Sequence, residues 1–389
     1  MIKLKGMTWN HERGINPLIK ASQIFKEKTG VSIDWDARSL ADFELFPLDI
    51  LANKYDFIMI DHPHIGVAHE ENLLKPLENL LPQELLKDQA EGTVGQSYKS
   101  YTWEGHQYAI PLDSAAQVSA YRKDLLEQTG NKLPSTWDNV FDLAIKLPKG
   151  AIAIPFVPVH AYSSFFTLCS HFSDMSKGQF WSDESDLSYE VGEKALDILI
   201  KLMSLANEKS KDCDPINILD IMKDSDEIIY CPLTYGYSNY SRSAYGKHIV
   251  TFRNMPKSVS RPSGSMIGGV GLSISSKCAH EKEAVEFVKM VIDKDFQRTI
   301  IYEADGQPGH IKSWKDETVN KGTDNFFIDT LETLTLGSLR PRFNGYINFQ
   351  AETGRLIRKF CLDGTGDKKI FIDKLNALIR KARNNKGLN

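Results

Sequence analysis

The stretch IKLKGMTW, Ile2–Trp9, opens a run of alternating strand-like and helix-like segments that decides the fold class. Apolar residues recur with a helical period over Pro17–Lys28 and over the shorter Phe43–Ala52. Between them, Val31–Trp35 alternates like a half-buried strand, and Tyr55–Ile60 reads as a buried strand. This β-α-β-α-β order predicts a parallel sheet with right-handed crossovers. We therefore expect an α/β fold.

Length and charge exclude several classes of protein. The chain has 389 residues, enough for about two to three domains. It carries 47 Lys and Arg against 51 Asp and Glu, a formal net charge of −4. Nucleic acid or an anionic membrane surface would need a basic face, so neither is expected as a partner. Apolar runs such as Phe57–Ile60 are too short to span a bilayer.

No cofactor or metal is expected. The five cysteines are too far apart for a zinc or redox motif, which favours reduced thiols. His62-Pro63-His64 is the densest histidine pair, but a proline between two histidines is typical of a loop. The first residues lack the apolar core of a secretory signal. This favours the cytoplasm, or an extracytoplasmic location if a leader has been removed.

Four groups of segments resemble one family. They are Gly105–Asp113 with Tyr121–Leu126, then Leu133–Asp138, then Gly268–Ile274 with Glu283–Phe287, and Gly306–Pro308. In their order and spacing they resemble the bacterial extracellular solute-binding proteins, family 1, of ABC importers, the group typified by sugar-binding proteins. Thr8–Gly14 and Arg340–Arg342 resemble one branch of that family.

The resemblance implies a two-lobe, periplasmic-binding-protein-like type II fold. Each lobe would be a mixed sheet flanked by helices, with the ligand cleft between the lobes. Lobe one would hold residues 1–110 and 264–310, and lobe two residues 111–263 and 311–389. The chain would cross between them near 110–113, 261–265 and 309–314. The lobes would close on a ligand by hinge motion.

Candidate ligand contacts come from the turns after strands and from the crossings. A polar ligand needs aromatic faces for its apolar side and hydrogen-bonding groups for its edges. Some candidates also have a packing interpretation: Trp9 and Trp35 as core residues, Asp61 as a helix cap. Arg13 could line the cleft or pair with Glu12. The expected ligand-binding set is Trp9, His11, Trp35, Arg38, Ser39, Asp61, His62, Asp113, Ser114, Gln117, Tyr235, Tyr237, Gly268, Gly269, Gln307 and Arg342.

The favoured function is a solute-binding protein that captures a small polar metabolite, a carbohydrate or a related compound, for an ABC-type importer. Its partners would be that ligand and the importer's membrane subunits, and the protein would be a monomer. The sequence has neither a GxSxG nor a P-loop motif, which disfavours hydrolase and nucleotide-binding functions.

Two alternatives use the same fold. The first is a cytoplasmic enzyme acting on a small anionic metabolite. Its acid–base groups would be His11, Asp61, His62 and Asp113, and Arg38 or Arg342 would hold a carboxylate or phosphate. The second is an intracellular sensor that signals by hinge closure.

Overall fold

The first part of the sheet is built as the sequence predicts. The computed structural model describes residues 2–173, 180–181, 185–257 and 264–384. Strand β1 (Lys3–Trp9) pairs in parallel with β2 (Ser32–Arg38) and β3 (Phe57–Ile60). Strand β9 (Ile267–Ile274) is antiparallel to β3, so the sheet is mixed.

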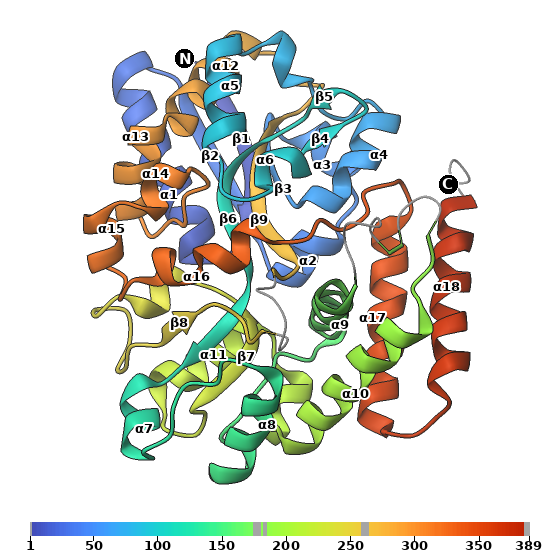
Figure 1. Cartoon of the computed structure of the whole chain (residues 1–389). Helices are drawn as coiled ribbons and strands as arrows, with labels where there is room; N and C mark the ends of the chain where they lie inside the picture. Colours follow the sequence, from blue (N-terminus) through green and yellow to red (C-terminus); the bar gives the residue numbers. More distant parts are fainter. Residues whose placement is uncertain (1, 174–179, 182–184, 258–263, 385–389) are drawn as a thin grey trace.

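A single long strand carries this sheet toward the other half of the molecule (Figure 1). Strand β6 (Ile110–Tyr121) is buried along its whole length. Its first part pairs with β9, and its last part pairs with β7 (Tyr230–Tyr235) and β8 (Thr251–Arg253). The sheet order is β2-β1-β3-β9-β6-β7, with β8 also on β6. The local patterns over Ala109–Asp113 and Val118–Tyr121 predict separate segments, and the structure joins them in one continuous strand.

The hydrophobic core is divided between the two ends of this sheet. One cluster comes from residues 4–112 and 270–301, and the other two come mainly from 116–267 and 314–379. Helices α1 (Glu12–Thr29) and α12 (Glu281–Ile292) contribute Phe25 and Phe287 to the first, with ring centroids 5.4 Å apart. The assignment of chain ranges to the two lobes stays a prediction.

Helices distant in sequence pack together in the second half. Figure 1 shows α17 (Tyr346–Asp363) and α18 (Lys368–Asn384) beside α9 (Pro158–Phe172) and α10 (Tyr189–Leu205). The C-terminal helices thereby complete a core that the middle of the chain begins.

The remaining elements cover the sheet and its edges. The other helices are α2 (Leu40–Leu45), α3 (Leu48–Lys54), α4 (Ile65–Glu70), α5 (Gln83–Gly92), α6 (Ser97–Ser100), α7 (Lys123–Gln128), α8 (Trp137–Lys146), α11 (Pro215–Asp224), α13 (Lys294–Phe296), α14 (Ile311–Trp314), α15 (Glu317–Lys321) and α16 (Phe326–Thr335). Short 3-10 or π turns are η1 (His62–His64), η2 (Leu77–Asn79), η4 (Glu208–Asp212), η5 (Ser238–Ser241) and η6 (Gln297–Ile301), and the small hairpin is β4 (Thr102–Trp103) with β5 (His106–Gln107).

Three predicted elements differ from the structure. Helix α1 begins at Glu12 instead of Pro17, because His11 Nδ1 accepts a hydrogen bond from the Arg13 amide at 3.1 Å and caps the helix. The predicted helix over Phe43–Ala52 is two helices, since the chain is extended at Phe46 before Pro47. The apolar run Ala151–Val157 also predicts a strand, but among the described residues it forms a single isolated bridge, from Ile152 to Tyr230.

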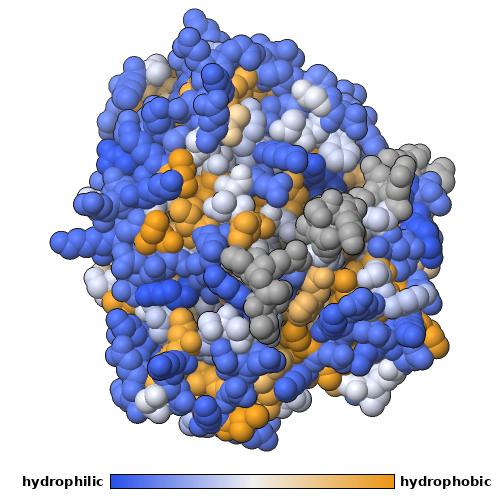
Figure 2. All heavy atoms as spheres, in the orientation of Figure 1, coloured by the Kyte–Doolittle hydropathy of each residue, from blue (hydrophilic) through white to orange (hydrophobic). Residues whose placement is uncertain are grey.

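The face of the molecule drawn in Figure 2 is largely polar. Figure 2 shows hydrophilic residues over most of one face, with apolar residues gathered across its middle and near its lower end. Within the described residues, no helix combines the length and apolar character needed to cross a membrane.

Candidate functional site

A cavity lies where β1, β3, β6 and β9 meet the start of α9. Its open volume is about 60 Å³. Carboxyl ends of parallel strands supply part of the wall, as expected for an open α/β sheet. The lining residues are Trp9, Arg13, Leu40, Phe43, Asp61, Asp113, Ala115, Val159, His160, Ser163, Pro215, Tyr235, Tyr237, Gly268, Gly269, Val270 and Arg340.

The first polar group of the cavity is the buried pair of Arg13 and Asp113. Arg13 Nε and Nη2 donate to the two carboxylate oxygens, both at 2.6 Å. Arg13 Nη1 donates to the Gly236 carbonyl at 2.9 Å, and the guanidinium lies 4.5 Å from the ring centroid of Tyr237. Arg13 follows β1 and Gly236 follows β7, so this one side chain ties the two halves of the sheet together.

The second polar group is Arg340 with Asp61. Arg340 Nη2 donates to both Asp61 oxygens at 2.6 Å, and Nη1 donates to Gln350 at 3.2 Å. Burial acts to raise the pKa of Asp61, but the Arg340 charge and hydrogen bonds from His62 and Arg340 outweigh it and hold that pKa well below its usual value. Asp61 is therefore an anion at neutral pH.

Aromatic rings and two glycines shape the remaining walls. Trp9 lies 5.7 Å from Phe43 between centroids, and Tyr235 and Tyr237 come from the other side. A Cβ on Gly268 would lie 2.8 Å from the Tyr235 ring. Gly269 has a φ of +93°, and its Cβ would lie 2.4 Å from the Asp113 carbonyl oxygen. Both positions need glycine for the backbone to pass this close.

Several predicted site residues lie in this cavity and others do not. The predicted residues among its lining are Trp9, Asp61, Asp113, Tyr235, Tyr237, Gly268 and Gly269. The predicted residues outside its lining are His11, Trp35, Arg38, Ser39, His62, Ser114, Gln117, Gln307 and Arg342.

Four of the outside residues support the cavity from behind. His11 caps α1 and its ring lies 4.9 Å from that of Tyr237. His62 Nδ1 is 3.3 Å from Asp61. Gln307 Nε2 donates to the Ser114 carbonyl at 2.8 Å, and its Oε1 accepts from the Ser238 amide at 2.9 Å. Ser114 Oγ is 3.2 Å from Ser97 Oγ.

The remaining predicted residues do not line this cavity, and their part in ligand binding stays a prediction. Trp35 donates to Ser22 and packs near Phe57 in the core of the first half. Ser39 caps α2. The other three make separate contacts: Arg38 over the Phe46 ring, Gln117 to Ser164 and Thr167, and Arg342 to the carbonyls of Lys99, Ser100 and Thr102. All are satisfied by local packing or hydrogen bonds.

The sequence analysis does not select three polar residues of the cavity lining, which are Arg340, His160 and Ser163. Arg340 stands in the segment Arg340–Arg342 that resembles one family branch, which is a usable signal. His160 has none, because it lies in the first turn of a helix and follows no regular strand. The sequence leaves two roles open for Arg13, lining the cleft or pairing with Glu12. In the structure Arg13 lines the cavity and pairs with Asp113, not with Glu12.

Comparisons with known proteins identify the family. The model of the family described as bacterial extracellular solute-binding protein matches residues 8–207. No curated protein sequence matches the chain. A solute-binding protein of Agrobacterium radiobacter K84 in complex with ribitol has a TM-score of 0.81 at 19% identity, covering 98% of each chain.

Two further solved structures agree in fold. Maltose-bound MalE3 of T. maritima has a TM-score of 0.81 at 18% identity, covering 98% of this chain and 99% of that one. A solute-binding protein of Agrobacterium vitis S4 with D-mannitol has a TM-score of 0.80 at 17% identity, covering 100% and 99%. The fold is the two-lobe α/β fold of these proteins. The chain belongs to the bacterial extracellular solute-binding proteins.

Proposed function

We propose that this protein captures a small carbohydrate or polyol in the cavity between its lobes and presents it to an ABC-type importer. The observation that carries the proposal is the cavity lining. Four aromatic rings stand beside two arginine–aspartate pairs, with groups from both halves of the sheet. Sugars have an apolar face that packs on aromatic rings and hydroxyl edges that bind charged hydrogen-bonding groups.

The same contacts support closure of the lobes on a ligand. Arg13 reaches the Gly236 carbonyl, and Arg340 from the C-terminal part of the chain reaches Asp61 after β3. A ligand that touches both walls binds the closed form better than the open form, so it shifts the population toward closure. Related folds that hold ribitol, D-mannitol or maltose support a polyhydroxylated ligand.

The partners and the location are part of the proposal. The protein would work as a monomer outside the cytoplasm and contact the membrane subunits of the importer. Fractionation of the source cells and sedimentation of the purified chain test these points. Protein recovered in the cytoplasm, or a stable dimer, would contradict them.

The binding function is tested by calorimetric titration with ribitol, D-mannitol, maltose and D-glucose. At least one probe should bind and be recovered unchanged. Tyr235→Ala should weaken that binding by about 1–3 kcal/mol, because it removes one aromatic face of the cavity. Tyr189→Ala is the control, since Tyr189 lies on α10 and is 45% exposed. Consumption of the probe would favour an enzyme instead.

A further inference from the structure

Two polar atoms in the cavity lining are buried without a partner among the described residues. They are Arg340 Nε and His160 Nδ1. Arg340 uses Nη2 for Asp61 and Nη1 for Gln350, which leaves its Nε–H as an unused donor. The side chains are buried, with relative exposures of 4% for Arg340 and 2% for His160. Buried polar groups are nearly always paired, so an unpaired donor and an unpaired imidazole nitrogen beside one cavity point to a ligand group.

The His160 imidazole is neutral at physiological pH. Burial lowers its pKa first, and the Arg340 charge lowers it further, to about 3. A neutral imidazole has one nitrogen that donates and one that accepts. Together with the Arg340 Nε–H donor, it can accept a hydrogen bond that a ligand group donates.

The charges of the cavity are already balanced. Arg13 pairs with Asp113 and Arg340 pairs with Asp61, at 2.6 Å in each case. A carboxylate ligand would add a third anion near these two aspartates, and an ammonium ligand would add a third cation near the two arginines. An unpaired buried charge is strongly unfavourable. A hydroxyl adds no charge, and through one oxygen it both accepts and donates a hydrogen bond.

We propose that a ligand hydroxyl binds between Arg340 Nε and the His160 imidazole. These two residues then select neutral polyhydroxylated ligands over carboxylate and amino counterparts. The inference rests on the proposed carbohydrate-binding function, and it adds the charge class of the ligand and two residues that determine it.

The test is calorimetric titration of the whole chain and its variants. The probes are ribitol, D-mannitol, maltose and D-glucose, with D-glucuronate and D-glucosamine as charged counterparts of D-glucose. His160→Phe keeps a ring but removes both nitrogens. It should lower the affinity for the neutral probe that binds best by about 10–100-fold. His160→Asn restores an amide near Nδ1 and should recover most of that loss. Arg340→Lys keeps a cation for Asp61 but removes Nε, so it should lower the affinity for the same probe about as much as His160→Phe does.

A matched control separates binding from structure. His171 is equally buried in the same helix but does not line the cavity, so His171→Phe should leave affinity unchanged. His160→Phe should leave the Tm of the unliganded protein unchanged or raise it, because it removes an unpaired buried group; a purely packing role would lower Tm and spare affinity.

The outcomes distinguish this inference from the function beneath it. Binding of a neutral probe that His160→Phe does not weaken overturns the hydroxyl site alone. Tighter binding of D-glucuronate or D-glucosamine than of D-glucose also overturns it. If no probe binds the unchanged protein, the carbohydrate function falls, and the hydroxyl site falls with it.

Discussion

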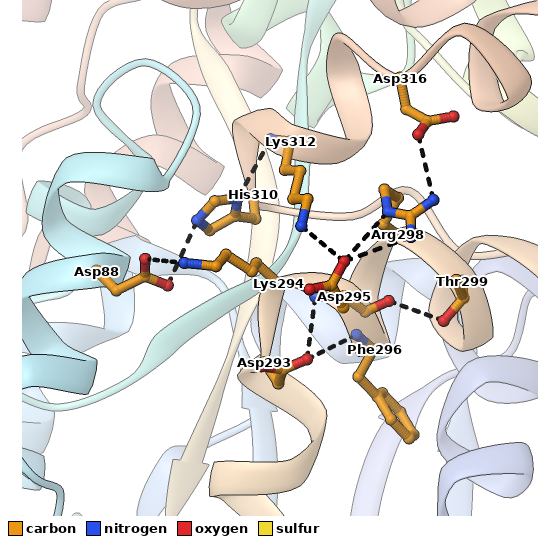
Figure 3. A network of polar contacts seen from close by, with 10 residues as sticks. All are labelled: Asp88, Asp293, Lys294, Asp295, Phe296, Arg298, Thr299, His310, Lys312 and Asp316. Atoms are coloured by element: carbon orange, nitrogen blue, oxygen red, sulfur yellow. Dashed lines mark hydrogen bonds and ion pairs between the residues drawn. The ribbon is translucent and has the colours of Figure 1, made fainter.

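Charged side chains meet in two regions of this molecule that differ in their exposure to water. In the cavity, the side chains of Arg13 and Asp113 are 4% and 6% exposed, and the two hydrogen bonds between them are 2.6 Å long. The second region surrounds α13, η6 and α14, where Figure 3 shows side chains converging from neighbouring elements. There, Lys294 pairs with Asp88 and Lys312 with Asp295, both at 2.7 Å, while all four side chains are 32–53% exposed.

The difference shows what each set of charges does. Exposed pairs keep much of their hydration and are screened by salt, so they contribute little to stability. Buried pairs have lost their hydration, and removing one member leaves an uncompensated charge. The cavity pairs therefore fix the geometry of the site, whereas the surface network only supplements the packing of helices near the third predicted crossing.

Removing one member of a cavity pair should have the largest effect. Asp61→Ala leaves the Arg340 guanidinium buried without its anion. We expect the free energy of unfolding to fall by about 3–5 kcal/mol, measured by urea denaturation. The double variant Asp61→Leu with Arg340→Met removes both charges and should recover much of that loss. A loss below about 1 kcal/mol for the single variant would show that this buried pair contributes no more to stability than an exposed ion pair.

The same contrast explains what the sequence can predict. Strands β1 to β3 follow from local hydrophobic patterns, and Trp9 and Asp61 follow from their places after strands. The pairing of the charged residues in the cavity cannot be predicted from local patterns. Arg13 binds Asp113 and Arg340 binds Asp61, and the members of each pair are far apart in the sequence. For Trp35 the local pattern gives the wrong end of the strand. The predicted strand ends at Trp35, but β2 continues to Arg38, and the Trp35 ring packs near Phe57 in the core of the first half.

The pH dependence of stability should distinguish the buried site from the surface. The pKa of His11 and of His62 is lowered to about 4, and that of His160 to about 3; burial is the largest cause in each case. Each folded pKa is below the unfolded value of about 6.5, so the unfolded state takes up protons first as pH falls. Their stabilisation is complete above pH 6.5 and is lost progressively below it.

For one such histidine the loss is roughly 2 kcal/mol between pH 6.5 and pH 5. Urea denaturation at both pH values measures this loss. Between the two pH values, the free energy of unfolding of His160→Phe should fall by roughly 2 kcal/mol less than that of the unchanged protein. Identical pH profiles for the two proteins would show that His160 is protonated in the folded state as easily as in water.

A smaller effect is expected where the backbone of β9 passes close to the backbone carbonyl of Asp113 in β6. Gly269→Ala places a Cβ 2.4 Å from the Asp113 carbonyl oxygen at a φ of +93°. We expect it to lower the free energy of unfolding by about 1–2 kcal/mol. Gly105→Ala is the control, because Gly105 also has a positive φ but its Cβ would meet nothing within 4 Å. Equal losses for both variants would assign the effect to φ alone and not to the cavity.

The surface network should give the smallest effect and the clearest dependence on salt. Arg298 donates to Asp316 at 3.2 Å and to Asp295 at 3.4 Å, and it is 32% exposed. Arg298→Ala should change Tm by no more than about 2 °C at low salt. That difference should vanish at 1 M NaCl, where the screening length is about 3 Å. The loss from Asp61→Ala should persist at the same salt concentration, because the Arg340 side chain is only 4% exposed and its charge is screened much less by dissolved ions. If salt erased both effects equally, the two regions would not differ in hydration, and the cavity pairs would have no special role in fixing the site.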